Sequence, residues 1–320
     1  GGTVRDPEQL RPIPYTYEGR SRPDYEEALE CLKLAFMSDE AFEHPDSVDR
    51  TLHDAMTHAV VADVFHKKAR TTDKRGGKHE CLKEAQKHAK AAYEGLPRHN
   101  LEDPDVKRHV LSSMDFYARL CREASDLKFG SSYSKEASKC WKEAIGKLEE
   151  WDLKEDEVAT NIYDHYVEFI WSQIPKREGT GMPLVRGPRE KIEEVRNMLE
   201  EIRPYLIQAT KNLCAQLAKG ALNSDLKHIL NRIGRIGGKL LAALRSLFIL
   251  AQSSGDEAKC QAFFRAIMDV GKDLQKLPNS DTRRQLLRYI QDFLREVQRW
   301  VQSRPVLREE AESLLRAVQE

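Results

Sequence analysis

Apolar residues recur at intervals of three and four along most of the chain, which is the spacing that places them on one face of an α-helix. In the first helical stretch, this face consists of Tyr25, Leu29, Leu32 and Phe36. Helices in the first half are expected to begin near Asp24, Asp46, His79, Pro104, Ser134 and Lys154. No stretch shows the sustained alternation of a β-strand, so the pattern predicts an all-α protein.

The first helices of successive pairs begin near Asp24, His79 and Ser134, which indicates a repeat of about 55 residues. Their sequences are similar: EEALECLKLAF, HECLKEAQKHAKAAY and SKEASKCWKEAIGKL. Helical hairpins at a fixed period stack into an α-solenoid, because no hairpin can bury its apolar face alone. The small alanines beside large aromatic residues resemble tetratricopeptide helix pairs, although the shorter period and the W-L-G-Y signature of that family are absent.

A second set of helices is expected beyond residue 188, with Pro204 starting or kinking one of them. Apolar residues then alternate by four and three in two consecutive stretches, 263–277 and 290–301, separated by a turn at residues 278–280. This spacing predicts an antiparallel hairpin within a helical bundle. The stretch before the second set, PKREGTGMPLVRGP at 175–188, contains three prolines and three glycines and predicts a linker or a functional loop.

We therefore expect four segments: an extended arm (1–23), a helix-hairpin solenoid (24–174), a linker or loop (175–188) and a helical bundle (189–320). The net charge of zero conceals a difference between the halves. Residues 1–180 contain 35 acidic and 28 basic residues, and the remainder contains 17 acidic and 24 basic ones. This separation predicts either an anionic partner for the C-terminal half or attraction between the acidic solenoid and the basic bundle.

The stretch 224–252 combines the longest apolar run of the chain with five basic residues and one acidic residue, Asp225. Gly234 and the pair Gly237-Gly238 predict a break that divides it into two helices. The segment IGRIGGKL (233–240) resembles the phosphate-clamping loop of KH domains, but those domains need flanking strands that this sequence does not predict. The candidate residues for binding an anion or a partner are Lys227, Arg232, Arg235, Gly237, Gly238, Lys239 and Arg245.

The apolar positions of the same stretch allow two interpretations. They can form a stripe buried in the bundle, or a membrane-active or partner-binding amphipathic helix, and we favour the buried stripe. Its members are Ile229, Ile233, Ile236, Leu240, Leu244, Leu247 and Leu250.

Catalytic and metal-binding signatures are weak. His53-Asp54, with His58, Asp63 and His66 on the same helix, resembles the metal-dependent phosphohydrolases named for that dipeptide. The earlier histidine that such a site needs is missing from the preceding helix, so we interpret these residues as solvated side chains. The six cysteines are widely spaced and are expected to be reduced thiols. We expect no metal, no cofactor and no enzymatic activity.

The expected location is intracellular, in the cytoplasm or the nucleus. No apolar run reaches the roughly 18 to 20 residues that a membrane-spanning helix needs, and residues 1–22 lack the pattern of a signal peptide. The leading hypothesis is a non-enzymatic scaffold or adaptor that binds a protein partner, since stacked hairpins present a long surface for peptides. The alternative is an anionic partner, nucleic acid or an acidic membrane surface, bound through residues 225–250.

Overall fold

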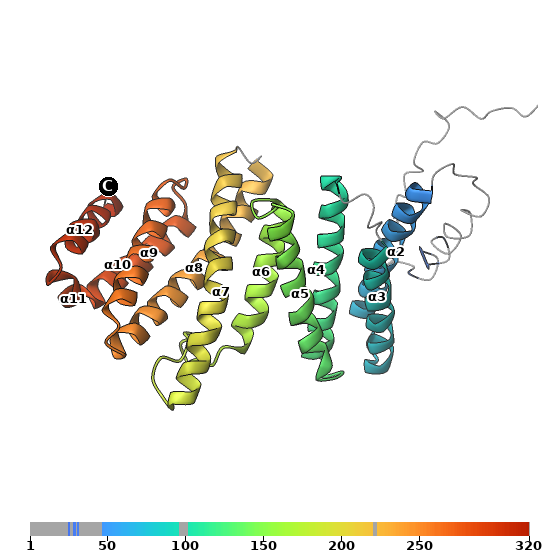
Figure 1. The fold of residues 1–320 in the computed structure, drawn as a ribbon, viewed down its shortest axis with the longest axis horizontal. Helices are drawn as coiled ribbons and strands as arrows, with labels where there is room; N and C mark the ends of the chain where they lie inside the picture. Colours follow the sequence, from blue (N-terminus) through green and yellow to red (C-terminus); the bar gives the residue numbers. More distant parts are fainter. Residues whose placement is uncertain are drawn as a thin grey trace, which may run out of the picture.

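The described part of the chain is a single row of α-helices in the computed structural model (Figure 1). The structure describes residues 47–95, 102–219 and 223–319, together with Tyr25, Ala28, Leu29 and Cys31. The expected N-terminal arm and most of the expected first helix lie outside the described residues. The helices are α2 (Ser47–Thr71), α3 (Arg75–Gly95), α4 (Pro104–Asp126), α5 (Ser132–Glu150), α6 (Glu157–Gln173), α7 (Arg189–Ala218), α8 (Asn223–Ser253), α9 (Glu257–Gln275), α10 (Asp281–Glu296), α11 (Gln298–Gln302) and α12 (Pro305–Gln319).

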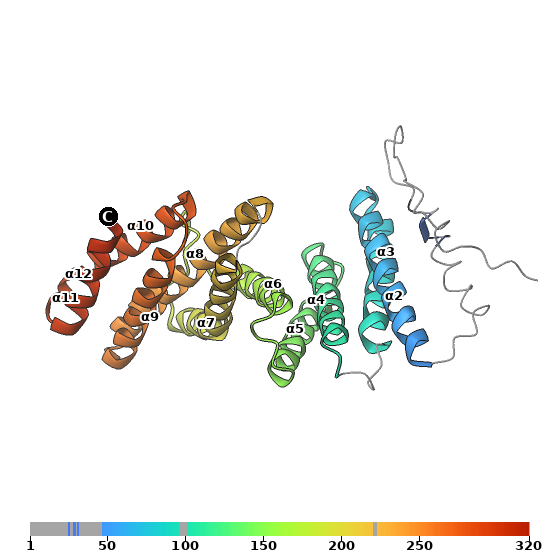
Figure 2. The same cartoon turned by 90° about the horizontal axis from the view of Figure 1, so that it is seen from above.

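Chain order is also spatial order along this row, from α2 at one end to α12 at the other (Figures 1 and 2). Most helix contacts join neighbours in sequence. Substantial contacts that skip one helix occur at α4 with α6 and α8 with α10, and α9 with α12 skips two. No β-strand occurs among the described residues. The expected all-α helical repeat fold is therefore confirmed.

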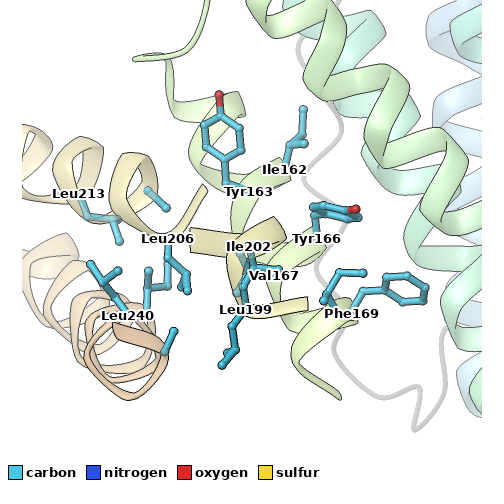
Figure 3. Packing of buried hydrophobic residues seen from close by; sticks show 14 of the residues in the cluster. Ile162, Tyr163, Tyr166, Val167, Phe169, Leu199, Ile202, Leu206, Leu213 and Leu240 are labelled. Atoms are coloured by element: carbon cyan, nitrogen blue, oxygen red, sulfur yellow. The ribbon is translucent and has the colours of Figure 1, made fainter. Parts of the chain in front are cut away.

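The apolar core runs along the row as one cluster, from Ala55 on α2 to Leu314 on α12. Figure 3 shows its central part, which includes Ile162 and Tyr166 of α6 and Leu199 and Ile202 of α7. All four of these side chains are completely buried. The core thus continues past residues 175–188, where the sequence predicts the boundary between solenoid and bundle.

The apolar stripe of α8 belongs to this core. Six of its seven expected members are buried, and Ile229 is half-buried. The buried-stripe interpretation is therefore confirmed, and little of the apolar face is left for a lipid surface. No helix in the described ranges is both long enough and apolar enough to cross a membrane.

The predicted break of α8 at Gly237-Gly238 is wrong, because α8 is continuous from Asn223 to Ser253. The glycines serve packing instead. A Cβ atom at Gly237 would lie 3.2 Å from Cδ1 of Leu286, and one at Gly234 would lie 3.2 Å from Cγ2 of Thr282. Both contacts come from α10, so the glycines let α10 approach α8 closely. This packing offsets the cost of about 1 kcal/mol in helix propensity that each glycine has relative to alanine.

One other helix start differs from the sequence prediction, and of the two expectations for Pro204 the start of a new helix is wrong. Helix α3 begins at Arg75, before the expected start near His79, and includes Gly76 and Gly77 in its first turn. Pro204 lies inside α7, which continues from Arg189 to Ala218. Residues that disfavour an isolated helix are tolerated here because neighbouring helices bury its apolar face.

Residues 175–187 form a folded loop between α6 and α7, which we call the α6–α7 loop. Lys176 and Pro183 form an antiparallel bridge. The amide of Arg177 donates to the carbonyl of Met182 at 2.8 Å, and the amide of Leu184 donates to that of Pro175 at 2.8 Å. These bonds make the loop a short hairpin with its own internal order.

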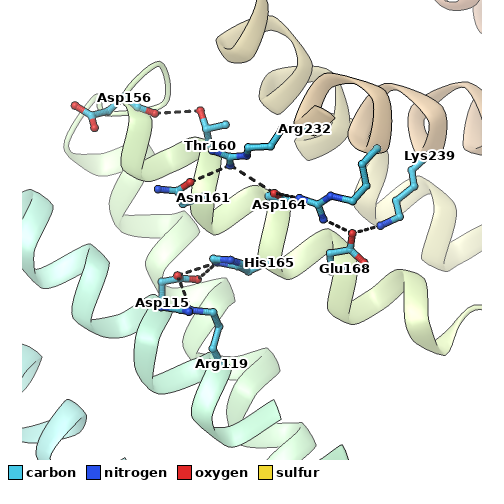
Figure 4. Close-up of polar contacts among 11 residues, drawn as sticks. Asp115, Arg119, Asp156, Thr160, Asn161, Asp164, His165, Glu168, Arg232 and Lys239 are labelled. Atoms are coloured by element: carbon cyan, nitrogen blue, oxygen red, sulfur yellow. Dashed lines mark hydrogen bonds and ion pairs between the residues drawn. The ribbon is translucent and has the colours of Figure 1, made fainter. Parts of the chain in front are cut away.

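A buried carboxylate joins three successive helices. Asp115 on α4 accepts a hydrogen bond from Nε1 of Trp141 on α5 at 2.9 Å. It accepts another from Nδ1 of His165 on α6 at 2.9 Å (Figure 4). Nε of Arg119 lies 3.2 Å from the same carboxylate. Because a buried charge is costly without partners, these contacts fix the relative positions of α4, α5 and α6.

The same substitution at two glycines tests the packing account. A Cβ at Gly271 on α9 would lie 2.7 Å from Cδ2 of Leu314 and 3.3 Å from Cδ1 of Ile290, whereas one at Gly146 on α5 would meet no atom within 4 Å. Gly146→Ala should raise the free energy of unfolding by about 1 kcal/mol through helix propensity. Gly271→Ala should lower it by about 1 to 3 kcal/mol through overpacking. Urea unfolding measures the free energy change of both variants. Stabilisation by Gly271→Ala would show that the helices around Gly271 are not closely packed.

Candidate functional site

Three of the candidate basic residues on α8 face an acidic row on α6 (Figure 4). Nη2 of Arg232 donates to Oδ1 of Asn161 at 2.9 Å and lies 3.4 Å from Oδ2 of Asp164. Arg235 pairs with both Asp164 and Glu168, and Lys239 pairs with Glu168. We call this group the α6–α8 ion network: Asn161, Asp164 and Glu168 on α6, and Arg232, Arg235 and Lys239 on α8.

The spacing of the two rows explains why they match. Positions 161, 164 and 168 follow each other by three and four, and positions 232, 235 and 239 do the same. Each row therefore lies along one face of its helix. The pairs also rise together in residue number, so α6 and α8 run parallel with the rows in register. The acidic half and the basic half of the chain are bonded to each other here.

Burial makes this network electrostatically strong. The side chain of Asp164 is 5% exposed, that of Arg232 is 14% and that of Lys239 is 16%. Burial raises the pKa of Glu168, but Lys239 and Arg235 outweigh it and hold that pKa below its ordinary value. At Lys239, burial and the charge of Arg235 together lower the pKa below its ordinary value, although Glu168 and Asp164 act to raise it. Removing Glu168 would leave the largely buried Lys239 without its ion-pair partner, which is costly.

The structure divides the seven candidate residues among different surroundings. Arg232, Arg235 and Lys239 face α6, whereas Gly237 and Gly238 face α10. Nη2 of Arg245 pairs with Oε2 of Glu296 at 2.8 Å, and its guanidinium lies 5.7 Å from the ring centroid of Tyr289. Lys227 is exposed and makes no ion pair with a residue that the structure describes. The seven residues therefore do not gather into one site.

A separate groove lies between α3 and α5, with α4 as its floor. We call it the α3–α5 groove, and its volume is about 290 Å³. Helices α3 and α5 both pack on α4, so the groove is the space between them. It is lined by Lys90, Tyr93, Glu94, Val110, Glu136, Lys139, Cys140, Glu143, Lys147 and Trp151.

The groove combines apolar side chains with charges of both signs. Val110 and Cys140 are buried, and the half-buried rings of Tyr93 and Trp151 lie beside them. Lys139 and Glu143 are exposed and make no ion pair with a described residue. Sequence reasoning missed this site, although the alternating charges at 136, 139, 143 and 147 follow helical spacing and were readable in the sequence.

The thiols near the core are held in their neutral form. Burial raises the pKa of Cys121 to about 12 and that of Cys214 to about 11. Burial likewise raises the pKa of Cys140, whose Sγ donates to the carbonyl of Met114 at 3.3 Å. Because the thiolate is the nucleophilic form, these three side chains act as packing groups.

The histidines of α2 contact two different partners. Nδ1 of His58 lies 2.8 Å from Nδ1 of His88 on α3. Nε2 of His66 lies 2.8 Å from Oε2 of Glu123 on α4. Within the described ranges, no cluster of three His, Cys, Asp or Glu side chains is arranged to hold a metal ion. His58 and His66 thus join helices through paired contacts, instead of the solvated positions expected from the sequence.

The chain was compared with protein families, curated proteins and solved structures. No family model matches the chain. No curated protein matches it either. Among solved structures, the crystal structure of the de novo designed helical repeat protein DHR64 is similar over 84% of this chain and 100% of that chain, with 13% identity and a TM-score of 0.25.

Neutralising Glu168 tests the α6–α8 ion network. Because the pKa of Glu168 is lowered on folding, its stabilising contribution is complete above its ordinary pKa of 4.5 and is lost as the pH falls through the lower folded value. Glu168→Gln should therefore lower the free energy of unfolding by about 1 to 3 kcal/mol at pH 7, and by less at more acidic pH. Glu309→Gln, at an exposed residue of α12, is the matched control. Urea unfolding between pH 3 and 7 measures the free energy of unfolding of both variants. The same dependence of this free energy on pH in the two variants would contradict the network.

Proposed function

We propose that the protein is a non-enzymatic helical scaffold that binds a peptide segment of a protein partner in the α3–α5 groove, in the manner of tetratricopeptide-like repeats. The observation that carries this proposal is the groove itself, in which apolar side chains lie between unpaired charges of both signs. Extended peptides and short helices need an apolar anchoring surface, and they gain orientation from charges at its edge.

Each part of the groove has a role in this proposal. Tyr93 and Trp151 supply aromatic surface for an apolar side chain of the peptide, as aromatic residues do at the centre of many interfaces. Lys139 and Glu143 lie four residues apart on the rigid helix α5, so they present opposite charges in a fixed order. The preferred peptide therefore carries an apolar or aromatic residue between charges of both signs.

The surroundings of α8 favour this proposal over an anionic partner bound through 225–250. Arg232, Arg235 and Lys239 already bond to acids of α6. To release them for nucleic acid or a membrane, the chain would have to leave buried carboxylates unpaired. The free thiols of the chain support the expected intracellular location.

A charge exchange in the groove tests the proposed function. A phage-displayed peptide library is panned against the wild-type protein, and the affinities of enriched peptides are measured by fluorescence polarisation. Lys139→Glu/Glu143→Lys should weaken binding by about tenfold, because it reverses the order of the charges while preserving the net charge.

The matched control is Asp269→Lys/Lys272→Asp, which exchanges one exposed pair on α9 away from the groove. This control should bind the peptides as well as wild type does. Failure to enrich any peptide family, or equal binding by the groove variant, would contradict the proposed function.

A further inference from the structure

A second pocket, far along the row from the α3–α5 groove, lies where the α6–α7 loop covers α8. Its volume is about 620 Å³, within the usual range for small-molecule sites. We call it the loop pocket. Its lining includes Arg177 and Arg186 of the loop, Arg245, Ser246 and Ile249 of α8, and Glu296 at the end of α10.

The loop side of this pocket is fixed by its own hydrogen bonds. Oγ1 of Thr180 donates to the carbonyl of Arg177 at 3.2 Å and accepts from the amide of Met182 at 3.3 Å. Gly179 and Gly181 have φ values of 73° and 66°, in the region that favours glycine, and they close the turn. The hydroxyl of Tyr289 on α10 also donates to Sδ of Met182 at 3.8 Å. The hairpin is thereby held against the helices.

The α8 side supplies an oriented guanidinium. Glu296 accepts from Nη2 of Arg245, and the ring of Tyr289 lies beside the guanidinium carbon. The Nε atom of Arg245 is buried and has no hydrogen-bond partner among the described residues. Ser246, 2% exposed, makes no side-chain hydrogen bond to a described residue. The side chain of Arg245 is 31% exposed and lines the pocket, so its guanidinium group can also donate to a ligand oxygen.

The charges of the loop pocket favour an anion. Arg177 and Arg186 are exposed and make no ion pair with any residue in the described ranges. Together with Arg245 they place three guanidinium groups against one carboxylate, Glu296. Guanidinium groups match the oxygens of phosphate and carboxylate through paired hydrogen bonds. The excess of two positive charges fits a dianion better than a monoanion.

We propose that the loop pocket binds a small phosphate monoester with an apolar body. The phosphate would lie among the guanidinium groups of Arg177, Arg186 and Arg245. Its organic part would lie against Leu184, Val185 and Ile249, which line the same pocket. This site is separate from the α3–α5 groove, so either proposal can fail without the other.

Phenyl phosphate is the probe, measured by isothermal titration calorimetry at low ionic strength on the full chain. Wild type should bind it at one saturable site, and inorganic phosphate should bind about tenfold more weakly because it lacks the apolar body. Phenol, which lacks the phosphate, should show no saturable binding. The affinity for phenyl phosphate should rise between pH 5 and 7, because the second phosphate ionisation lies near pH 6 while arginine stays charged.

Arg177→Ser/Arg186→Ser should weaken phenyl phosphate binding by about tenfold or more, and both residues are exposed, so the fold should be retained. Arg265→Ser/Arg299→Ser removes the same charge from exposed positions on α9 and α11 and should bind as wild type does. The proposal is overturned if wild type shows no saturable binding or if the two variants bind equally. Equal affinities for inorganic phosphate and phenyl phosphate would also overturn it.

Discussion

Each helix of this chain can bury its apolar face only against helices close to it in sequence, and the rest of the structure depends on that constraint. The contacts follow chain order from α2 to α12, and the buried cluster is continuous along the row. In such a stack, stability comes from the interface between each helix and its neighbours. The surfaces left over lie between the alternate helices that do not pack closely, α3 with α5 and α6 with α8, where side chains meet across a wider gap.

Those wider gaps have different chemistry along the row. Between α6 and α8, two rows of opposite charge are in register and bond to each other. Between α3 and α5, the gap stays open as a groove with unpaired charges. Part of the charge asymmetry of the sequence is thus satisfied within the molecule, between α6 and α8. The groove and the loop pocket carry the proposed binding functions because their charges are not satisfied in that way.

The sequence predicted well which face of each helix is buried, and poorly which other helices contact it. The apolar stripe of α8 was predicted residue by residue, because helical periodicity shows which side of a helix is buried. The break at Gly237 was predicted wrongly, since the close approach of α10 is a tertiary contact that periodicity does not contain. Arg235 and Lys239 looked available for an anion for the same reason: their partners lie about seventy residues away on α6. The order of residues 175–187 depends on backbone bonds that composition alone did not reveal.

Arg232, Arg235 and Lys239 bond α8 to α6. Hydrogen exchange followed by mass spectrometry, on wild type and an Asp164→Asn/Glu168→Gln variant, tests this bonding most directly. We expect faster exchange in α6 and α8 together, because both lose their shared ion pairs. Exchange in α3 and α12 should change little, since these helices lie far along the row. If the variant is folded and hydrogen exchange in α8 is as slow as in wild type, these ion pairs do not hold α8 to α6.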